Sequence, residues 1–295
     1  MAQPNRVQVW LLAARPKTLP AALAPVLIGT AMAYEAGALH WPSALACFAF
    51  ALLAQIGTNL CNDYSDFKKG ADTETRQGPV RVTQAGLLSP ETVLRGTVVV
   101  FTLAILVGLL LVWRGGWPLL VLGVAAIAAG ILYTAGPIPY GYLGLGDLFV
   151  LIFFGPVAVG GTYYVQAQTI APEPIVAGLL AGLLSVAILV VNNLRDMKGD
   201  KEAGKRTLAV RFGAPFARVE YVLCMIIPLV VPTVYALVTG THRWILLVWL
   251  AGPLAMPVLK TVLTRSDGAA LNPALGQTAK VLLLYSVVFS IAWNL

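Results

Sequence analysis

Two short polar segments, each at the end of an apolar stretch, carry the same arrangement of amide and carboxylate side chains. In the first, Asn62 is followed four residues later by Asp66. In the second, Asn192 is followed at the same spacing by Asp196 and then by Asp200. Residues four apart share one face of a helix, so each segment is expected to present a stripe of oxygen atoms. The two segments start 130 residues apart, which indicates a weak internal repeat.

The side chains of these segments suit a hard divalent cation. Two facing rows of carboxylates repel one another strongly unless positive charge lies between them. Oxygen ligands favour Mg²⁺, which typically binds one or two carboxylates together with water and substrate phosphates. Neither segment contains a His or a Cys, which argues against zinc. The pattern therefore predicts a magnesium site, and the alternative is a pair of solvated loops whose acids balance nearby lysines.

Basic residues are interleaved with both segments or follow them. Near the first segment they are Lys68, Lys69, Arg76 and Arg81, and near the second they are Arg195, Lys205 and Arg206. Carboxylates, Mg²⁺ and Arg or Lys side chains together can hold a diphosphate and stabilise it as a leaving group. The segments therefore predict a diphosphate site, with some of these cations expected to serve membrane topology instead.

The elements that must carry these segments are long apolar helices. The chain has 295 residues, of which 58% are hydrophobic and 11% are charged, so the bilayer is its expected solvent. A spanning helix needs about 20 mostly apolar residues. Nine windows meet this requirement, namely 19–38, 41–62, 91–113, 117–134, 145–165, 172–194, 216–238, 243–263 and 274–294. We predict an all-α integral membrane protein with nine spans, with eight or ten as alternative counts.

The distribution of basic residues gives the expected orientation. When alternate loops of a nine-span chain are compared, one side receives 18 of the 20 Lys and Arg residues, and the other receives Arg114 and Arg243. The positive-inside rule makes the richer side cytoplasmic. We therefore expect a multi-pass protein of the inner (cytoplasmic) membrane, with the N-terminus and both acidic segments in the cytoplasm. Nine of the 13 acidic residues lie within 63–91 and 196–220, and topology alone does not require acids, so these loops are expected to carry chemistry.

Other classes of protein are less consistent with the sequence. The net charge of +7 comes from no basic tail or aromatic-interleaved patch, which argues against nucleic-acid binding. The three cysteines, Cys47, Cys61 and Cys224, have no spacing typical of a metal site or a disulfide framework. The apolar stretch before Arg15 is too short for a signal-peptide core and is expected to form a helix on the membrane surface. Ser89, Pro90 and Glu91 predict the start of the third span.

Several motifs resemble those of the UbiA superfamily of intramembrane aromatic prenyltransferases. The two Asp clusters are typical of the whole superfamily. Three further stretches resemble its 1,4-dihydroxy-2-naphthoate polyprenyltransferase branch, namely Gly78-Pro79-Val80-Arg81, Tyr133-Thr134-Ala135-Gly136-Pro137 and Gly204-Lys205-Arg206-Thr207. The resemblance implies Mg-dependent transfer of a polyprenyl group from its diphosphate to 1,4-dihydroxy-2-naphthoate in menaquinone biosynthesis, with loss of CO₂ and diphosphate to give demethylmenaquinone.

The resemblance also implies a fold. A single transmembrane domain over residues 1–295 would place about nine helices around a central cavity. Polar cytoplasmic loops, at about 63–90 and 195–215, would cap this cavity. A lateral opening would admit the lipid tail of the donor.

The site residues implied by the resemblance fall into three groups. Two Mg²⁺ ions are implied, with the ligands Asn62, Asp63, Asp66, Asp72, Asn192, Asp196 and Asp200. Four of these are expected to be catalytic, namely Asp66, Asp72, Asp196 and Asp200. The diphosphate contacts are Lys68, Lys69, Arg76, Arg81, Tyr133, Arg195, Lys205 and Arg206, and the acceptor contacts are Arg15, Lys17 and Asp147. The rings of Tyr133, Tyr140 and Tyr142 either face an allylic cation or belong to an interfacial belt.

Two positions depart from the family's pattern. The superfamily's first motif often ends in an Asp where this chain has Gly70, and we assign that role to Asp72. Asp147 lies where this branch is expected to have a Glu, which keeps the charge and shortens its reach.

Two other functions remain open from the sequence. A secondary transporter also has repeat-related polar sites between helices, but those sites lie near the bilayer midplane. The acidic segments here follow the apolar windows, so they are expected at the cytoplasmic edge. A related prenyltransferase with another acceptor, such as 4-hydroxybenzoate, is the second alternative.

Overall fold

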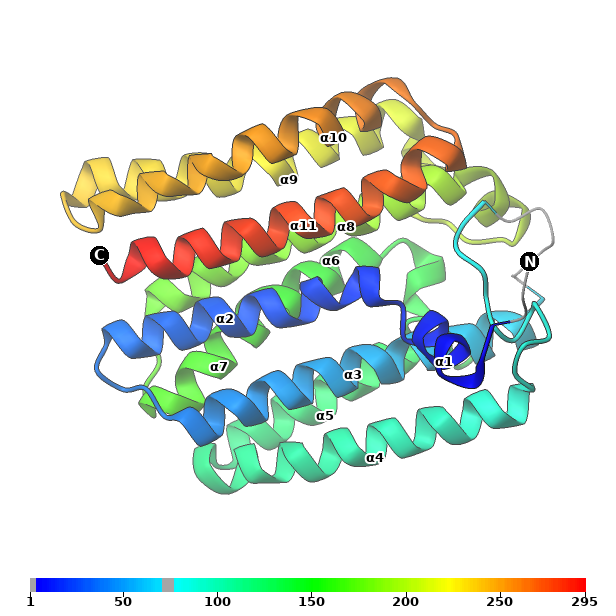
Figure 1. Ribbon diagram of the computed structural model, residues 1–295, viewed down its shortest axis with the longest axis horizontal. Coiled ribbons are helices and arrows are strands. Elements are labelled where there is room, and N and C mark those ends of the chain that lie inside the picture. The colour runs from blue at the N-terminus through cyan, green and yellow to red at the C-terminus, as the bar shows by residue number, and fades with distance from the viewer. Residues whose placement is uncertain (1–3, 71–76) are drawn as a thin grey trace.

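Apolar helices aligned along one axis make up most of the protein (Figure 1). The computed structural model describes residues 4–70 and 77–295, and these contain no strand. The helices are α1 (Arg6–Ala14), α2 (Leu19–Glu35), α3 (Trp41–Lys68), α4 (Pro90–Gly115), α5 (Trp117–Leu132), α6 (Gly146–Ile152), α7 (Ala158–Ala167), α8 (Pro172–Glu202), α9 (Leu208–Thr239), α10 (Gly252–Thr264) and α11 (Gly268–Trp293). Helix α1 and the C-terminal end of α11 lie at opposite ends of the bundle (Figure 1), as an odd number of crossings requires.

Eight of the nine predicted spans are long and apolar enough to cross a bilayer within the described residues. The window at 117–134 forms α5, which has only 16 residues. At 1.5 Å per residue, α5 is about 24 Å long, shorter than the ~30 Å hydrocarbon core. Gly123 and Gly130 of α5 nevertheless pack in order against Phe50 and Thr58 of α3. Helix α5 therefore runs beside α3 and returns the chain to the end of the bundle at which α4 begins.

Two of the spans are not continuous α-helices. Between α6 and α7, residues Phe153–Val157 form a π-helical turn in which Gly155 leaves helical geometry and Pro156 follows it. A 3₁₀ segment, Arg243–Ala251, precedes α10. Single π-helical turns inside helices are frequent at functional sites, and this turn lies beside a cavity described below.

The predicted start of the third span is confirmed. The Oγ atom of Ser89 accepts a hydrogen bond from the backbone N–H of Thr92 at 3.2 Å. Pro90 is the first residue of α4, and Glu91 lies in its first turn. A Ser cap of this kind typically stabilises a helix by about 1 kcal/mol, which fixes where the polar loop before α4 ends.

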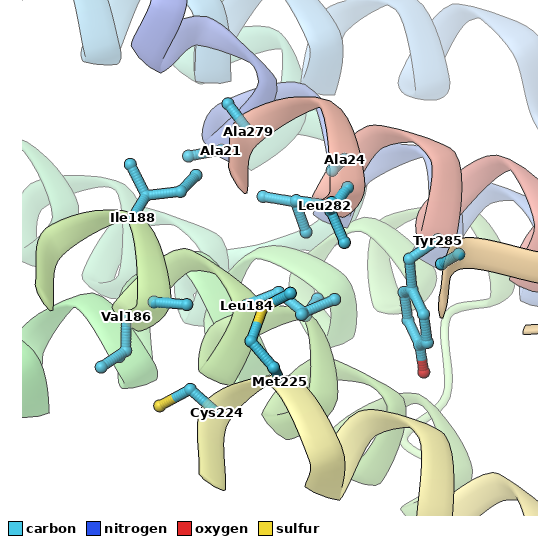
Figure 2. Close-up of a cluster of buried hydrophobic side chains, with 14 of the residues drawn as sticks. Ala21, Ala24, Leu184, Val186, Ile188, Cys224, Met225, Ala279, Leu282 and Tyr285 are labelled. Atoms are coloured by element: carbon cyan, nitrogen blue, oxygen red, sulfur yellow. The ribbon is translucent and has the colours of Figure 1, made fainter. Parts of the chain in front are cut away.

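The largest hydrophobic core joins α2, α8, α9 and α11 (Figure 2). Leu184 of α8 lies between Ala21 of α2 and Met225 of α9, and Ile188 of α8 lies on the same side as Ala21 (Figure 2). The alanines of α2 and α11 allow close approach of the helix backbones. The buried hydroxyl of Tyr285 donates a hydrogen bond to the backbone oxygen of Pro228 at 3.0 Å.

Close packing also joins α8 to the π-helical turn. A Cβ atom at Gly178 would lie 2.8 Å from backbone atoms of Pro156, and one at Gly182 would lie 2.5 Å from the backbone oxygen of Leu151. Side chains at these positions would collide with backbone atoms. The glycine pair therefore holds α8, which carries the second acidic segment, directly against the turn.

The first helix is confirmed, and its position at a membrane surface stays a prediction. Val9 and Ala13 of α1 are buried, while Val7, Leu11 and Leu12 are exposed. Trp10 rests on Gly96 of α4, where a Cβ atom would lie 2.7 Å from the indole ring.

Candidate active site

Two adjoining cavities extend from the end of the bundle that carries the acidic segments. The polar cavity has a volume of about 500 Å³. The apolar cavity, of about 280 Å³, is lined mainly by α2 to α7 and the π-helical turn. Six residues line both cavities and are called the junction below, namely Gln55, Asn62, Tyr133, Val150, Phe154 and Leu189. One ligand with a polar head and an apolar tail can therefore occupy both cavities.

The two acidic segments converge on the polar cavity. Ten of the predicted site residues line it, namely Arg15, Asn62, Asp66, Arg81, Tyr133, Asn192, Arg195, Asp196, Asp200 and Lys205. The oxygen stripes expected at the ends of α3 and α8 therefore lie around one space, although the sequence separates them widely.

Asp66 binds donors from three distant parts of the chain. Its Oδ1 accepts a hydrogen bond from the phenol of Tyr142 at 2.8 Å, and its Oδ2 accepts one from Nη2 of Arg81 at 3.0 Å. The Nζ atom of Lys205 lies 3.4 Å from Oδ1. The Asp66 side chain is only 1% exposed, so two cations balance a carboxylate that is almost fully removed from water.

Asp63 lies one helical turn earlier and contacts the backbone of the polar loop. Its two carboxylate oxygens accept hydrogen bonds from the backbone N–H groups of Val82 and Thr83, both at 3.1 Å. Asp63 lines neither cavity. These contacts hold the loop that carries Arg81, so the geometry supports a positioning role, and metal binding by Asp63 stays a prediction.

Arg195 organises the second acidic segment. Its Nε and Nη2 atoms donate to the two carboxylate oxygens of Asp196 at 2.8 and 2.6 Å. The Nη2 atom also donates to Oδ1 of Asn192 at 2.7 Å, and Nη1 donates to Oδ1 of Asn272 at 3.0 Å. The guanidinium predicted to contact diphosphate thus orients the neighbouring oxygen ligands in this structure.

Helix α11 links the two segments through residues that the sequence analysis missed. The Nδ2 atom of Asn272 donates to the backbone oxygen of Gln77 at 2.8 Å. The Oε1 atom of Gln77 accepts from the backbone N–H of Gly268 at 2.9 Å. Asn272 therefore connects Arg195 to the loop before α4. A single Asn near the start of an apolar window belongs to no motif, so no sequence signal marks it.

Two lysines contact the ring of Tyr142 and have different second partners. The Nζ atoms of Lys205 and Lys69 lie 4.7 and 5.1 Å from the ring centroid. Lys69 also donates to the backbone oxygens of Thr134 and Gly136, at 2.7 and 3.1 Å. Lys69 therefore fastens the loop after α5, whereas Lys205 faces the polar cavity.

Tyr133 forms part of the junction and is held by two glycines. A Cβ atom at Gly141 would lie 2.7 Å from the backbone oxygen of Tyr133, and one at Gly146 would lie 3.3 Å from its ring. The ring meets that of Tyr140 edge to face, with the centroids 5.4 Å apart.

Several predicted residues do not reach the cavities. Six of them line neither cavity, namely Lys17, Asp63, Lys68, Lys69, Asp147 and Arg206. Lys17 is exposed, and Asp147 is buried at the start of α6, where its Oδ1 has no hydrogen-bond partner among the described residues. Asp72 and Arg76 lie outside the described residues. Binding roles for all of these residues stay predictions.

The lining of the polar cavity fits a magnesium ion that shares its ligands with a substrate. No group of three or more His, Cys, Asp or Glu side chains is assembled for a metal in residues 4–70 and 77–295. Asp66 and Asp196 are instead paired with Arg81 and Arg195. Mg²⁺ usually takes only one or two carboxylates and fills its remaining positions with phosphate oxygens and water. The oxygen donors around this cavity meet that requirement.

The fold and the site define a membrane-embedded enzyme for a substrate with an anionic head and a long apolar tail. The chain belongs to the UbiA prenyltransferase family, whose model matches residues 22–287. It is 40% identical over 294 residues to the 1,4-dihydroxy-2-naphthoate octaprenyltransferase of Escherichia coli (strain K12), covering 97% of this chain and 95% of that relative. It is 39% identical to the enzyme of the same name from Mycobacterium tuberculosis (strain ATCC 25618 / H37Rv), covering 94% of each chain.

A solved structure has the same fold. The UbiA homologue from Archaeoglobus fulgidus bound to GPP and Mg²⁺ superimposes with a TM-score of 0.60, covering 96% of this chain and 99% of that one at 15% identity. The fold expected from the sequence, an all-helical membrane protein of the UbiA type, is therefore confirmed.

Proposed function

We propose that this protein transfers a polyprenyl group from polyprenyl diphosphate to 1,4-dihydroxy-2-naphthoate, releasing diphosphate and CO₂ and giving demethylmenaquinol, the reduced form of demethylmenaquinone. The names of the two bacterial relatives support the acceptor. The observation that carries the proposal is the meeting of a polar and an apolar cavity at one junction. This arrangement suits a donor whose diphosphate and hydrocarbon chain need opposite surroundings.

The polar cavity holds the diphosphate in this proposal. Asn62, Asp66, Asn192, Asp196 and Asp200 would hold Mg²⁺, with two ions expected. The metal, when bound, would neutralise the diphosphate oxygens and help the allylic C–O bond to break.

The cations of the polar cavity stabilise the leaving group. Arg81 and Lys205 now pair with Asp66, and both can turn their N–H donors to diphosphate oxygens. Their charges favour the negative charge that grows on the diphosphate as the C–O bond breaks.

The junction protects the reacting carbon from water. Val150, Phe154 and Leu189 line both cavities, so apolar side chains form one side of the point where the head and tail of the donor meet. Water there would quench an allylic cation, and its exclusion also strengthens every electrostatic contact. The neutral ring of Tyr133 offers a π-face to the positive charge.

Arg15 supports binding of the aromatic acid. It lines the polar cavity and sits at the corner between α1 and α2 with a φ of 52°. Its guanidinium can hold a carboxylate before the reaction. The ring's π electrons form the new bond to the allylic carbon, and the electrons of the ring–carboxylate bond restore the ring as CO₂ leaves.

A simple assay tests the proposal. Purified protein should release diphosphate from a polyprenyl diphosphate only when Mg²⁺ and 1,4-dihydroxy-2-naphthoate are both present, and 4-hydroxybenzoate should not replace the naphthoate. Transfer to 4-hydroxybenzoate instead would overturn the proposed acceptor. Uptake of an intact ligand without bond cleavage would favour the transporter, although the acidic residues that line the polar cavity lie near the C-terminal ends of α3 and α8 rather than at their centres.

The proposal includes one transferase domain over residues 1–295 in the inner membrane, with the polar cavity facing the cytoplasm. Lys201, in the last turn of α8, and Thr169, in the connection before α8, are both exposed, and the three native cysteines are buried. In right-side-out vesicles, Thr169→Cys should react with an impermeant thiol reagent and Lys201→Cys should not. The pattern should reverse in inverted vesicles. Equal labelling of both positions would disprove the orientation.

A further inference from the structure

A polar side chain at the junction, that of Gln55, has no role in the mechanism above. Gln55, Asn62 and Asp66 share one face of α3 by their helical spacing. Asp66 lines only the polar cavity, whereas Gln55 lines both cavities. Gln55 therefore lies deeper along the same stripe, beside the point where the allylic carbon and the aromatic ring must meet.

The hydroxyl of Thr18 fixes the orientation of the Gln55 amide. The Oγ1 atom of Thr18 donates its proton to the backbone oxygen of Arg15 at 3.0 Å. It accepts hydrogen bonds from Nδ2 of Asn59 at 3.1 Å and from Nε2 of Gln55 at 3.3 Å. A hydroxyl has one proton, so both amides must present N–H to it. The carbonyl oxygen of Gln55 therefore points away from Thr18, and in the part of the chain that the structure describes no group donates to it.

The same corner of the fold holds Arg15. The Nη2 atom of Arg15 donates to the backbone oxygen of Asn59 at 3.4 Å. Asn59 in turn donates from Nδ2 to the backbone oxygen of Ala14 at 2.9 Å. One wall of the polar cavity thus presents a cation for a carboxylate and, through Gln55, an oxygen that accepts hydrogen bonds.

We infer that Gln55 is an acceptor-binding residue whose Oε1 accepts a hydrogen bond from a ring hydroxyl of the aromatic acid. The inference rests on the proposed function and names a contact within its acceptor site. A carboxamide oxygen is too weak a base to take the hydroxyl proton, so Gln55 orients the ring at the junction and selects for the hydroxyl. A site built around a substrate hydroxyl rejects an analogue without it, because the buried protein group is then left unpaired.

Acceptor analogues test this contact directly. The probes are 1,4-dihydroxy-2-naphthoate, 1-hydroxy-2-naphthoate and 4-hydroxy-2-naphthoate, titrated against the full-length protein without donor and followed by fluorescence. One of the two analogues lacks the hydroxyl that Gln55 binds. This analogue should bind to the wild type about tenfold or more weakly than the natural acceptor does. In Gln55→Leu the analogue lacking that hydroxyl should bind as well as the natural acceptor, within about twofold. The KM for polyprenyl diphosphate should stay within about twofold of wild type.

Matched variants separate the contact from a loss of structure. Thr58→Val changes a residue of α3 that lines only the apolar cavity, and this variant should keep the wild-type discrimination between analogues. Thr18→Val removes the hydroxyl that orients the Gln55 amide and should reduce the discrimination. Gln55→Asn should do the same, because its side chain is one methylene shorter and its oxygen lies farther from the ring hydroxyl. These two variants carry the test if Gln55→Leu fails to fold.

The outcomes that overturn the inference differ from those that overturn the function. Unchanged discrimination in Gln55→Leu, or a donor KM raised as much as the acceptor Kd, would show that Gln55 does not bind the hydroxyl. Failure of the proposed function would appear earlier, as a wild-type protein that releases no diphosphate with the naphthoate. If the protein prenylates a different hydroxylated acid and Gln55 still discriminates between the analogues, the inference holds and the proposed acceptor is wrong.

Discussion

The two acidic segments have the same sequence spacing and are supported in different ways. The partners of Asp66 in the first segment are Arg81, Tyr142 and Lys205, which lie 15, 76 and 139 residues away. The main partner of Asp196 in the second segment is its neighbour Arg195. The first carboxylate therefore depends on contacts across the tertiary fold, whereas the second is bound on both oxygens by the residue next to it in the same helix.

Burial makes this difference larger. The Asp66 carboxylate is 1% exposed and that of Asp196 is 11% exposed, although Arg195, which keeps two amide oxygens as partners, is as deeply buried as Arg81. A buried ion pair gains little net stability over apolar packing, but removal of one partner leaves a buried charge uncompensated at a cost of about 3–5 kcal/mol. The fold should therefore tolerate changes at the second segment better than changes at the first.

The largest expected effect separates activity from stability. Asp66→Ala and Asp196→Ala should each reduce kcat by about 100-fold or more, because both carboxylates hold positive charge at the leaving diphosphate. Asp66→Ala should also lower the melting temperature in detergent, because it leaves the buried Arg81 without this carboxylate. Asp196→Ala should lower the melting temperature less, because the buried Arg195 keeps its hydrogen bonds to Asn192 and Asn272. Equal melting temperatures in the two variants would contradict the comparison.

A smaller effect should distinguish the two lysines on Tyr142. Lys205→Gln should raise the KM for polyprenyl diphosphate by about tenfold, because a charged hydrogen bond to the diphosphate contributes about 1.5–3 kcal/mol. Lys69→Gln is the matched control, since Lys69 contacts the same ring but bonds to backbone oxygens. Its donor KM should change by less than about threefold. Steady-state kinetics with varied donor measures both, and equal shifts would place Lys69 at the diphosphate as well.

The link through α11 should have a modest effect. Asn272→Ala breaks the connection between Arg195 and Gln77, and kcat should fall by about threefold to tenfold as Asp196 loses its fixed orientation. Asn272→Asp keeps an oxygen for Arg195 but loses the donor to Gln77. Recovery of kcat in Asn272→Asp would show that orientation of Arg195 matters more than the loop, whereas wild-type kcat in both variants would remove Asn272 from the site.

The sequence predicts what depends on local spacing. The stripe from Asn62 to Asp66, its counterpart on α8 and the apolar windows all follow from helical periodicity, and the structure places both stripes at one cavity. Span lengths are less certain from sequence, because α5 ends after 16 residues at Leu132. The predicted window runs to residue 134, but the helix ends two residues earlier and a turn follows it.

Sequence spacing does not show which basic residue contacts which carboxylate. Lys69 is closer in sequence to Asp66 than Lys205 is, yet Lys205 contacts the carboxylate and Lys69 contacts the loop after α5. Asp147 belongs to a motif that suggested acceptor binding, and it lines neither cavity, so that role stays a prediction. These outcomes depend on how loops fold back over the helix ends, and single-sequence patterns do not contain that information.

The smallest expected effect concerns the start of α11, the helix whose Asn272 contacts Arg195 of the second segment. Asp267 caps this helix, accepting from the backbone N–H of Ala270 at 3.0 Å and from Nε of Arg265 at 2.8 Å. The hydrogen bond from Arg265, followed by that from Ala270, lowers the pKa of the carboxyl below its ordinary value of 3.8. Because the folded-state pKa is depressed, the stability from this charge is fully present above pH 3.8 and is lost as the pH falls through the lowered pKa. Asp267→Asn keeps a capping oxygen without the charge, so it should melt slightly below wild type at pH 6, and the difference should vanish as the pH falls below 3.8. Thermal melts of both proteins across this range measure the effect, and a difference that grows on acidification would show that the Asp267 charge does not stabilise the start of α11.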